Sequence, residues 1–196
     1  MNWLAHVFLS EPNVEFQLGN LLADVVRGPQ RDGMSAEFVR GASCHKAIDA
    51  FTDAHTVVKR SRSRISSEYR RFSGVLVDVF YDYYLARDWG RYSSITLEAY
   101  TADFYARAQA QRIRLPPDAR TMLDRIIRHD LLGSYAQVEG VERALRRLST
   151  YLDSRWQKQF ALERSVRDLV AHEAAFAADF HEFFPQLQAH VTELAI

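Results

Sequence analysis

The spacing of apolar residues is the feature of this sequence that most restricts its fold. Apolar side chains recur three and four residues apart over long stretches, whereas strict alternation of apolar and polar residues is scarce. The first pattern is typical of helices with one buried face, and the second of strands. Only eight glycines and five prolines interrupt the chain. We therefore predict an all-α protein, a single-domain helical bundle spanning residues 1–196.

Caps and helix breakers set the expected boundaries. Ser35 is suited to cap a helix because Glu37 follows in its first turn, and Pro117 fits the start of another. Gly19 marks a point where a second helix could approach closely. The expected helices span residues 2–9, 16–26, 35–56, 75–89, 96–114, 117–131, 138–151 and 155–181, with a basic segment before the fourth and a last helix after Pro185.

Composition narrows the class of protein. The chain is 47% hydrophobic and 26% charged, with 25 basic and 25 acidic side chains, so no net charge favours nucleic acid or membrane as a partner. Cys44 is the only cysteine, which excludes an internal disulfide and fits a reducing cytosol. The apolar opening is brief and lacks the basic n-region of a signal peptide. We expect a cytoplasmic protein.

The segment CHKAIDAFTDAH, residues 44–55, carries the first candidate site. His45, Asp49 and Asp53 are each four residues apart, so a helix places them on one face. An imidazole and carboxylates one turn apart can bind a divalent cation, because their Cβ atoms lie only about 5–6 Å apart. The alternative is a solvated polar stripe.

Two further segments carry carboxylates among apolar residues. Asp78 and Asp82 are four apart in VLVDVFYDYYLARDW, and buried carboxylates need partners, which a metal or tyrosine and arginine side chains would supply. In GNLLADVV, Asp24 lies one turn after Asn20, with a surface pair to Arg27 as the alternative.

His6 stands alone in an apolar stretch, where a histidine is more often a satisfied core residue than a ligand. Taken together, these histidines and aspartates suit Mn²⁺, Mg²⁺, Fe²⁺ or Zn²⁺, and the lack of cysteine ligands weakens a structural zinc site.

Four blocks, MNWLAH, GNLLADVVRG, GASCHKAIDAFTD and VLVDVFYDYYLARDW, occur in the order and spacing of the acyl carrier protein phosphodiesterases. The chain resembles that family clearly over its first ninety residues, and beyond them by length and helical character. The resemblance implies an HD-domain-like, metal-dependent enzyme that removes 4′-phosphopantetheine from holo-acyl carrier protein and favours Mn²⁺, with Mg²⁺ or Fe²⁺ as alternatives. The implied metal ligands are His6, Asp24, His45, Asp49 and Asp78.

The sequence departs from the HD pattern because the matching block contains no adjacent His-Asp pair. Lys46 also stands where close relatives would have arginine, which keeps the charge but loses the bidentate fork for phosphate. The implied catalytic residues are Asp24, His45, Asp49 and Asp82, with Asp82 or Asp53 as base. The expected substrate-binding residues are Asn20, Arg27, Lys46, Asp53, Arg62 and Arg64.

Arg62 and Arg64 belong to the arginine-rich segment VVKRSRSRISSEYRRF, which contains one acidic residue. Acyl carrier proteins are typically acidic, so this segment is the expected docking surface, with a solvated basic face as the alternative. Two other functions stay open. One is an HD-type phosphohydrolase of a nucleotide such as guanosine tetraphosphate, and the other is a non-catalytic helical adaptor that needs no metal.

Overall fold

Helices make up almost all of the regular structure. The computed structural model describes residues 1–194, and within them there are eleven α-helices, short 3₁₀ turns and no strand, which confirms the all-α prediction. The α-helices are α1 (Trp3–Phe8), α2 (Val14–Leu22), α3 (Pro29–Asp32), α4 (Ala36–Ala54), α5 (Thr56–Ser63), α6 (Ser73–Arg87), α7 (Leu97–Gln111), α8 (Pro117–Arg128), α9 (Val138–Trp156), α10 (Val166–Ala171) and α11 (Glu173–Glu193).

The helices with the clearest sequence signals begin and end close to where they were predicted. Ser35 caps α4, since its hydroxyl accepts a hydrogen bond from the Phe38 amide. Pro117 occupies the first turn of α8. The basic segment, by contrast, forms a helix of its own, α5, whose N-cap is His55.

The prediction for residues 155–181 is wrong. Helix α9 continues to Trp156 and ends at Gln157, whose φ of 52° is left-handed. A loop follows, and Ala161 is also left-handed, with a φ of 47°. The chain then forms α10 and α11. Pro185 lies inside α11 instead of starting a new helix, between Phe184 and Leu187, which are both fully buried.

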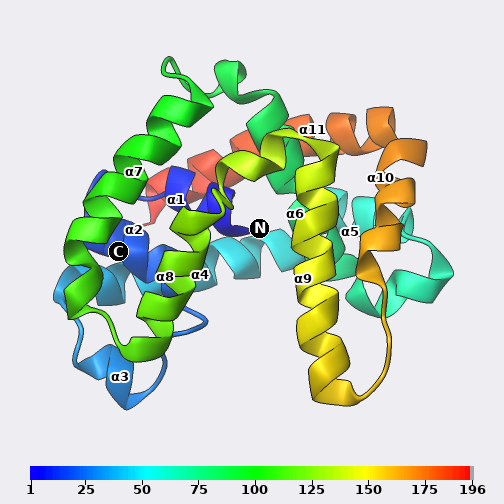
Figure 1. Cartoon of the computed structure of the whole chain (residues 1–196). Coiled ribbons are helices and arrows are strands. Elements are labelled where there is room, and N and C mark those ends of the chain that lie inside the picture. Colours follow the sequence, from blue (N-terminus) through cyan, green and yellow to red (C-terminus); the bar gives the residue numbers. More distant parts are fainter. Residues whose placement is uncertain (195–196) are drawn as a thin grey trace.

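Figure 1 shows α7 and α8 on one side of the molecule, α9 and α10 on the other, and α1, α4 and α6 between them. Helices α2 and α4 pack closely, α1 contacts α2 and α6, and α11 runs along α4, α5 and α6. No helix among residues 1–194 is both long and apolar enough to span a bilayer.

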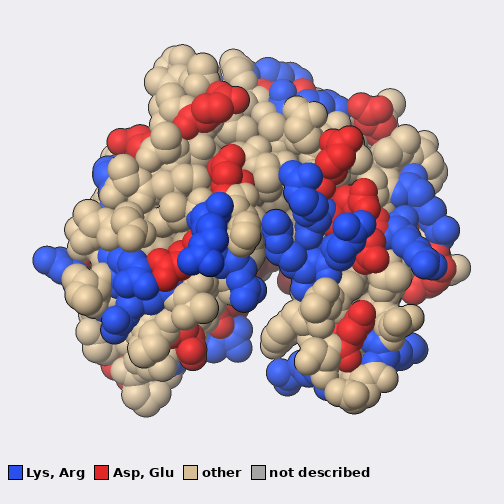
Figure 2. All heavy atoms as spheres, in the orientation of Figure 1, with Lys and Arg blue, Asp and Glu red and all other residues tan. Residues whose placement is uncertain are grey.

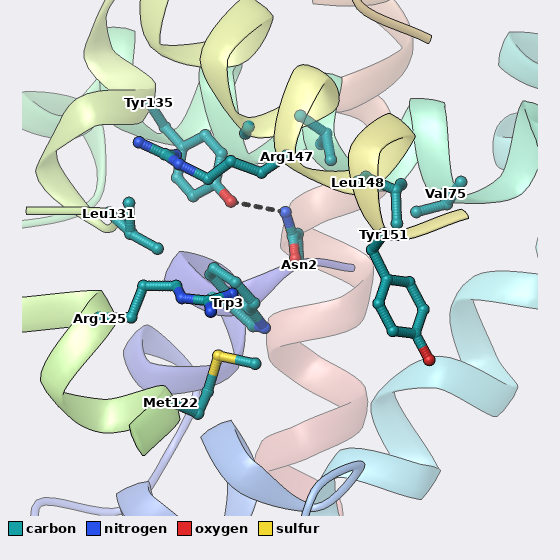
Figure 3. A pocket seen from close by; sticks show the side chains of 12 residues that line it. Asn2, Trp3, Val75, Met122, Arg125, Leu131, Tyr135, Arg147, Leu148 and Tyr151 are labelled. Carbon is teal, nitrogen blue, oxygen red and sulfur yellow. Dashed lines mark hydrogen bonds between the residues drawn. The ribbon is translucent and has the colours of Figure 1, made fainter. Parts of the chain in front are cut away.

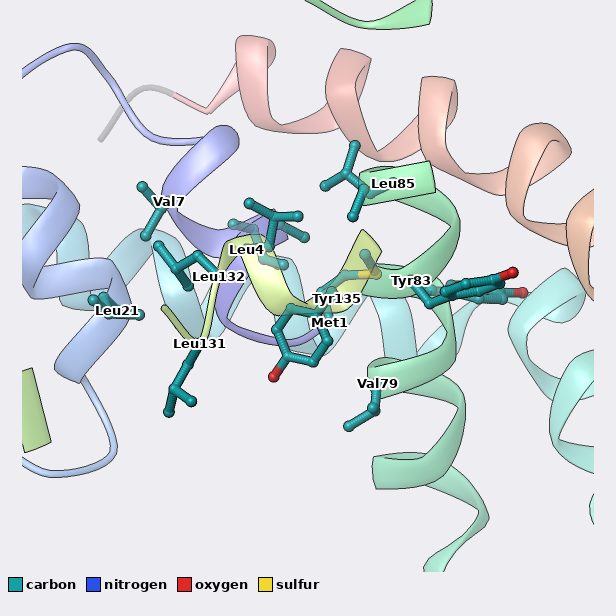
Figure 4. Packing of buried hydrophobic residues seen from close by; sticks show 14 of the residues in the cluster. Met1, Leu4, Val7, Leu21, Val79, Tyr83, Leu85, Leu131, Leu132 and Tyr135 are labelled. Carbon is teal, nitrogen blue, oxygen red and sulfur yellow. The ribbon is translucent and has the colours of Figure 1, made fainter. Parts of the chain in front are cut away.

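A continuous core holds α1 against α6. In Figure 4, Leu4 of α1 and Val79 and Leu85 of α6 lie with Leu132 and Tyr135 from the turn that precedes α9. All five are buried, and burial stabilises each by roughly 1.5–3 kcal/mol. The core therefore fixes His6, on α1, relative to α6.

Candidate metal centre

Two glycines set the distance between the helices that carry most of the candidate site. A Cβ atom on Gly19 would lie 2.0 Å from the carbonyl oxygen of Phe38, and one on Gly41 would lie 2.0 Å from that of Phe16. Only glycine permits this approach of α2 and α4, as predicted for Gly19. His45 on α4 is thereby brought against Asn20 on α2.

His6, His45 and Asp49 form a compact cluster, and their ligand atoms all lie within 4.8 Å of one another. The Nε2 atoms of His6 and His45 lie 3.3 and 3.1 Å from the Asp49 carboxylate oxygens. The two rings stack with their centroids 4.1 Å apart. Both histidines are buried, while 41% of the Asp49 side chain is exposed.

Asn20 orients both histidine rings. The Nδ1 of His45 lies 2.8 Å from the backbone carbonyl oxygen of Asn20, which can only accept, so Nδ1 carries the hydrogen. The Asn20 side-chain amide donates to the His6 carbonyl and to Ser10 Oγ, which leaves its Oδ1 to accept from His6 Nδ1 at 2.8 Å. Both Nε2 atoms therefore face Asp49, and that of His6 also lies 3.2 Å from the Met1 carbonyl oxygen, so a proton or a cation is needed between these groups. Metal-binding histidines are typically held in this way.

The same contacts perturb the charges in the cluster. Burial disfavours a charged His45, but hydrogen bonds to Asp24 and Asp49 outweigh it and raise the pKa of His45 to about 9. Burial also opposes charge on Asp49, yet hydrogen bonds from His45 and His6 hold its pKa far below the usual value. The pKa of His6 is lowered, chiefly by burial. His45 thus takes a proton that faces an ionised Asp49.

Asp78 extends the cluster on the side of α6. The amine of Met1 is fully buried and lies 3.2 Å from Asp78 Oδ1 and 3.6 Å from Asp49 Oδ1. Burial opposes its charge, but Asp78 and Asp49 raise the pKa of the amine. Asp78 Oδ1 is itself buried and accepts no hydrogen bond of normal geometry from residues 1–194. These carboxylates therefore favour a cation between α4 and α6.

Asp24 lies at the outer rim of the cluster. Its side chain is 74% exposed, pairs with Arg27 at 3.0 Å, and has one oxygen 3.7 Å from His45 Nε2. The hydrogen bond with His45 is the main cause of its lowered pKa. Asp24, Arg27, Arg31, Lys46 and His45 line a hollow of about 290 Å³. Arg31, which the sequence analysis did not single out, follows the resembling block and donates hydrogen bonds to the carbonyl oxygens of Ala23 and Val26.

Other predicted site residues lie elsewhere. Asp82 is fully buried under α1, where its two oxygens accept hydrogen bonds from the amides of Leu4 and Ala5, and burial raises its pKa to about 7. Those bonds hold the start of α1, because the Asn2 side chain makes no cap. Its predicted role as base stays a prediction.

Asn20 was predicted to bind substrate. It is fully buried, and its side chain and carbonyl oxygen contact the two histidines. The remaining three predicted residues form intramolecular ion pairs away from the cluster: Asp53 with Arg62, and Arg64 with Asp179.

The residues present fit a divalent metal ion. Ligand bonds of about 2.0–2.2 Å place two ligand atoms of one ion roughly 3.0–3.5 Å apart. His6 Nε2 lies 3.3 Å from Asp49 Oδ1 and His45 Nε2 lies 3.1 Å from Asp49 Oδ2, and one ligand atom from each of the three residues lies within 4.8 Å of the others. Nε2 lone pairs aimed at a carboxylate repel it unless a proton or a cation lies between them. Nitrogen and carboxylate ligands suit several divalent ions.

The fold and this cluster define an all-helical protein with a candidate site for a divalent metal. Comparison with known proteins gives the family. Residues 1–187 match the family described as acyl carrier protein phosphodiesterase, well beyond the ninety residues of clear resemblance. The chain belongs to this family of hydrolases, as predicted.

Its relatives match along nearly their whole length. An acyl carrier protein phosphodiesterase of Escherichia coli O157:H7 is 31% identical over 199 residues, covering 100% of both chains. Proteins of the same name from Pectobacterium atrosepticum and Photorhabdus laumondii are each 30% identical, over 95% of this chain and 95% and 93% of theirs. No solved structure matches the chain, so the predicted likeness to HD domains stays a prediction.

Proposed function

We propose that this protein hydrolyses the phosphodiester between 4′-phosphopantetheine and the serine of holo-acyl carrier protein, and that it uses Mn²⁺. The observation that carries the proposal is the convergence of His6, His45 and Asp49, with both imidazoles oriented by Asn20. The names of the relatives supply the substrate. The cytoplasmic location expected from the sequence belongs to the same proposal.

His6, His45 and Asp49 would hold the ion. Asp24, at the His45 end of the cluster, and Asp78, at its α6 end, would be further carboxylate ligands. A bound divalent ion lowers the pKa of its water and neutralises charge on phosphoryl oxygens.

The chain's own residues do the rest. Asn20 fixes the orientation of the two imidazole rings, and the ionised carboxylate of Asp49 stabilises positive charge on the groups that face it. Arg27, Arg31 and Lys46, around the hollow beside His45, attract the phosphoryl group to that side of the cluster. The reaction adds water across the phosphorus–serine oxygen bond, so the carrier protein regains its serine hydroxyl.

The decisive test is to incubate the purified protein with holo-acyl carrier protein and Mn²⁺ and to weigh the product by mass spectrometry. We expect the carrier protein to lose one phosphopantetheine group, and the loss to stop when a chelator removes the metal. Asp49→Asn should abolish turnover. Asp103→Asn, which removes an exposed carboxylate paired with Arg107 on α7, is the matched control and should stay active.

The result also separates the two alternative functions. A nucleotide phosphohydrolase would release product from guanosine tetraphosphate and leave the carrier protein's mass unchanged. An adaptor would release no phosphopantetheine, and the mass of the carrier protein would stay unchanged with Mn²⁺ and with chelator alike. Either outcome would refute the proposal.

A further inference from the structure

An apolar groove of about 370 Å³ opens between α1, α6, α8 and α9. Figure 3 shows Trp3 and Met122 on one side of it and Val75, Leu148 and Tyr151 on the other. Tyr151 is 60% exposed, and Val75 is 37% exposed. Large apolar side chains are thus left open to solvent around a concave site, which is typical of a place where a ligand binds.

The groove and the candidate metal centre share helix α6 and the start of the chain. Its wall residues Val75 and Val79 flank Asp78 along α6. Asn2 lies in the groove and directly follows Met1, whose amine contacts both Asp78 and Asp49. The Asn2 side chain donates to the hydroxyl of Tyr135 at 2.7 Å, which gives the groove a polar point near its floor. A molecule in the groove would therefore lie on the part of α6 that also carries Asp78.

Three arginines gather at this groove without an acidic partner. Arg125 and Arg147 line it, and Arg143 lies one helical turn before Arg147 on α9. None of the three forms an ion pair with any residue in the described range 1–194, whereas the neighbouring Arg146 pairs with Glu142. Burial, together with the charges of Arg143 and Arg125, lowers the pKa of Arg147.

Like charges placed four residues apart destabilise a helix, and Arg143 and Arg147 stand in this relation on α9. Figure 2 shows basic side chains gathered around the hollow between the α8 and α9 sides of the molecule. This arrangement contrasts with Arg62 and Arg64, whose charges are already met by Asp53 and Asp179. Uncompensated positive charge therefore lies beside the apolar groove, whereas the charges of Arg62 and Arg64 are already paired.

We propose that the groove and the cluster of Arg125, Arg143 and Arg147 form the docking surface for the holo-carrier protein. The apolar walls receive the pantetheine arm, whose methyl groups pack on them and whose amides can meet Asn2 and Tyr135. The three arginines pair with acidic side chains of the carrier protein. This inference rests on the proposed function, which supplies an acidic protein bearing such an arm, and charge complementarity selects this occupant.

Binding is measured with apo- and holo-carrier protein against the chelator-treated enzyme, so that no turnover occurs. Arg143→Glu, which changes an exposed side chain, and the double variant with Arg147→Glu test the cluster. We expect the double variant to bind both forms of the carrier protein about tenfold more weakly, as expected for the loss of two exposed ion pairs. Arg146→Glu makes the same charge change on the same helix outside the groove and should bind as the unaltered protein does.

Ala144→Trp tests the groove, because it fills the wall with a large side chain. It should weaken binding of the holo form and spare the apo form, which lacks the arm. Mn²⁺-dependent hydrolysis of a small aryl phosphodiester checks that the metal centre of each variant is intact.

Equal binding by the double variant and Arg146→Glu would overturn the arginine surface, and equal effects of Ala144→Trp on both forms would overturn the placement of the arm. The variants could show these binding differences while the unaltered protein releases no phosphopantetheine. In that case the proposed function fails and the docking surface stands.

Discussion

Replacing Asn20 with alanine should cost both stability and metal affinity. The substitution removes the acceptor of the His6 Nδ1 hydrogen and two donated bonds, to the His6 carbonyl and to Ser10 Oγ. The buried imidazole hydrogen is left without a partner, at about 1–3 kcal/mol, and the two other bonds are worth about 1 kcal/mol each. We therefore expect the free energy of unfolding to fall by roughly 3–5 kcal/mol.

The metal effect has a separate cause. His45 keeps its bond, because it is made to the backbone carbonyl of residue 20, but His6 loses the group that fixes its ring. Loss of such a partner typically weakens metal binding by about 10–100-fold. Urea unfolding with chelator present gives the stability, and calorimetric titration with Mn²⁺ at a temperature where the variant is folded gives the affinity.

Asn13→Ala is the matched control on the same helix. The Asn13 side chain caps α2 by accepting from the amides of Glu15 and Phe16, and its loss should cost about 1 kcal/mol without changing metal affinity. The reasoning is refuted if folded Asn20→Ala binds Mn²⁺ as tightly as the unaltered protein. It is also refuted if both variants weaken binding equally, since the loss would then reflect only a less stable α2.

Three further predictions follow from packing and protonation. Gly41→Ala should destabilise the protein by about 1–3 kcal/mol and weaken metal binding, because the new methyl group forces α4 away from α2. Gly90→Ala, which has open space around it, should do neither in the same unfolding and titration assays. Because the pKa of His45 is raised to about 9, metal must displace its proton at neutral pH, so the apparent affinity for Mn²⁺ measured by titration should rise about tenfold per pH unit up to that pKa and level off above it. Burial raises the pKa of Asp82 from 3.8 to about 7, so the folded protein holds more protons than the unfolded chain between those pH values. The free energy of unfolding should therefore fall as pH rises through that window, by up to about 1.4 kcal/mol per pH unit. Asp82→Asn should remove this slope in urea unfolding curves.

Local signals predicted most of the fold, and they failed where backbone conformation was decided by tertiary contacts. Ser35 and Pro117 predicted helix starts because their effect is confined to one turn. Gln157 and Ala161 adopt left-handed conformations without the glycine that usually signals them, so the break after α9 was not visible. Pro185 signalled a break that the buried aromatic packing of α11 overrides.

The candidate site was predictable as far as helical geometry reaches. His45 and Asp49 meet because they are one turn apart, but Asp53, one turn further, has left the cluster and pairs with Arg62. The role of Asn20 depends on contacts with residues 14 and 25 positions away, and no pattern within one helix reports such contacts.

The surroundings of the metal centre differ at its two ends, and this difference matches the chemistry of a phosphopantetheine diester. At the His45 end, the hollow carries Arg27, Arg31 and Lys46, which suits phosphoryl oxygens. On the α6 side, Val75 and Val79, which stand on either side of Asp78 in the sequence, line an apolar groove, which suits an arm of low charge. A nucleotide polyphosphate could meet Arg125 and Arg147 at the edge of this groove, but it would gain nothing from the apolar walls, which an uncharged arm would contact. The asymmetry therefore favours a substrate whose charge is concentrated at one phosphate and whose remaining length is mostly uncharged.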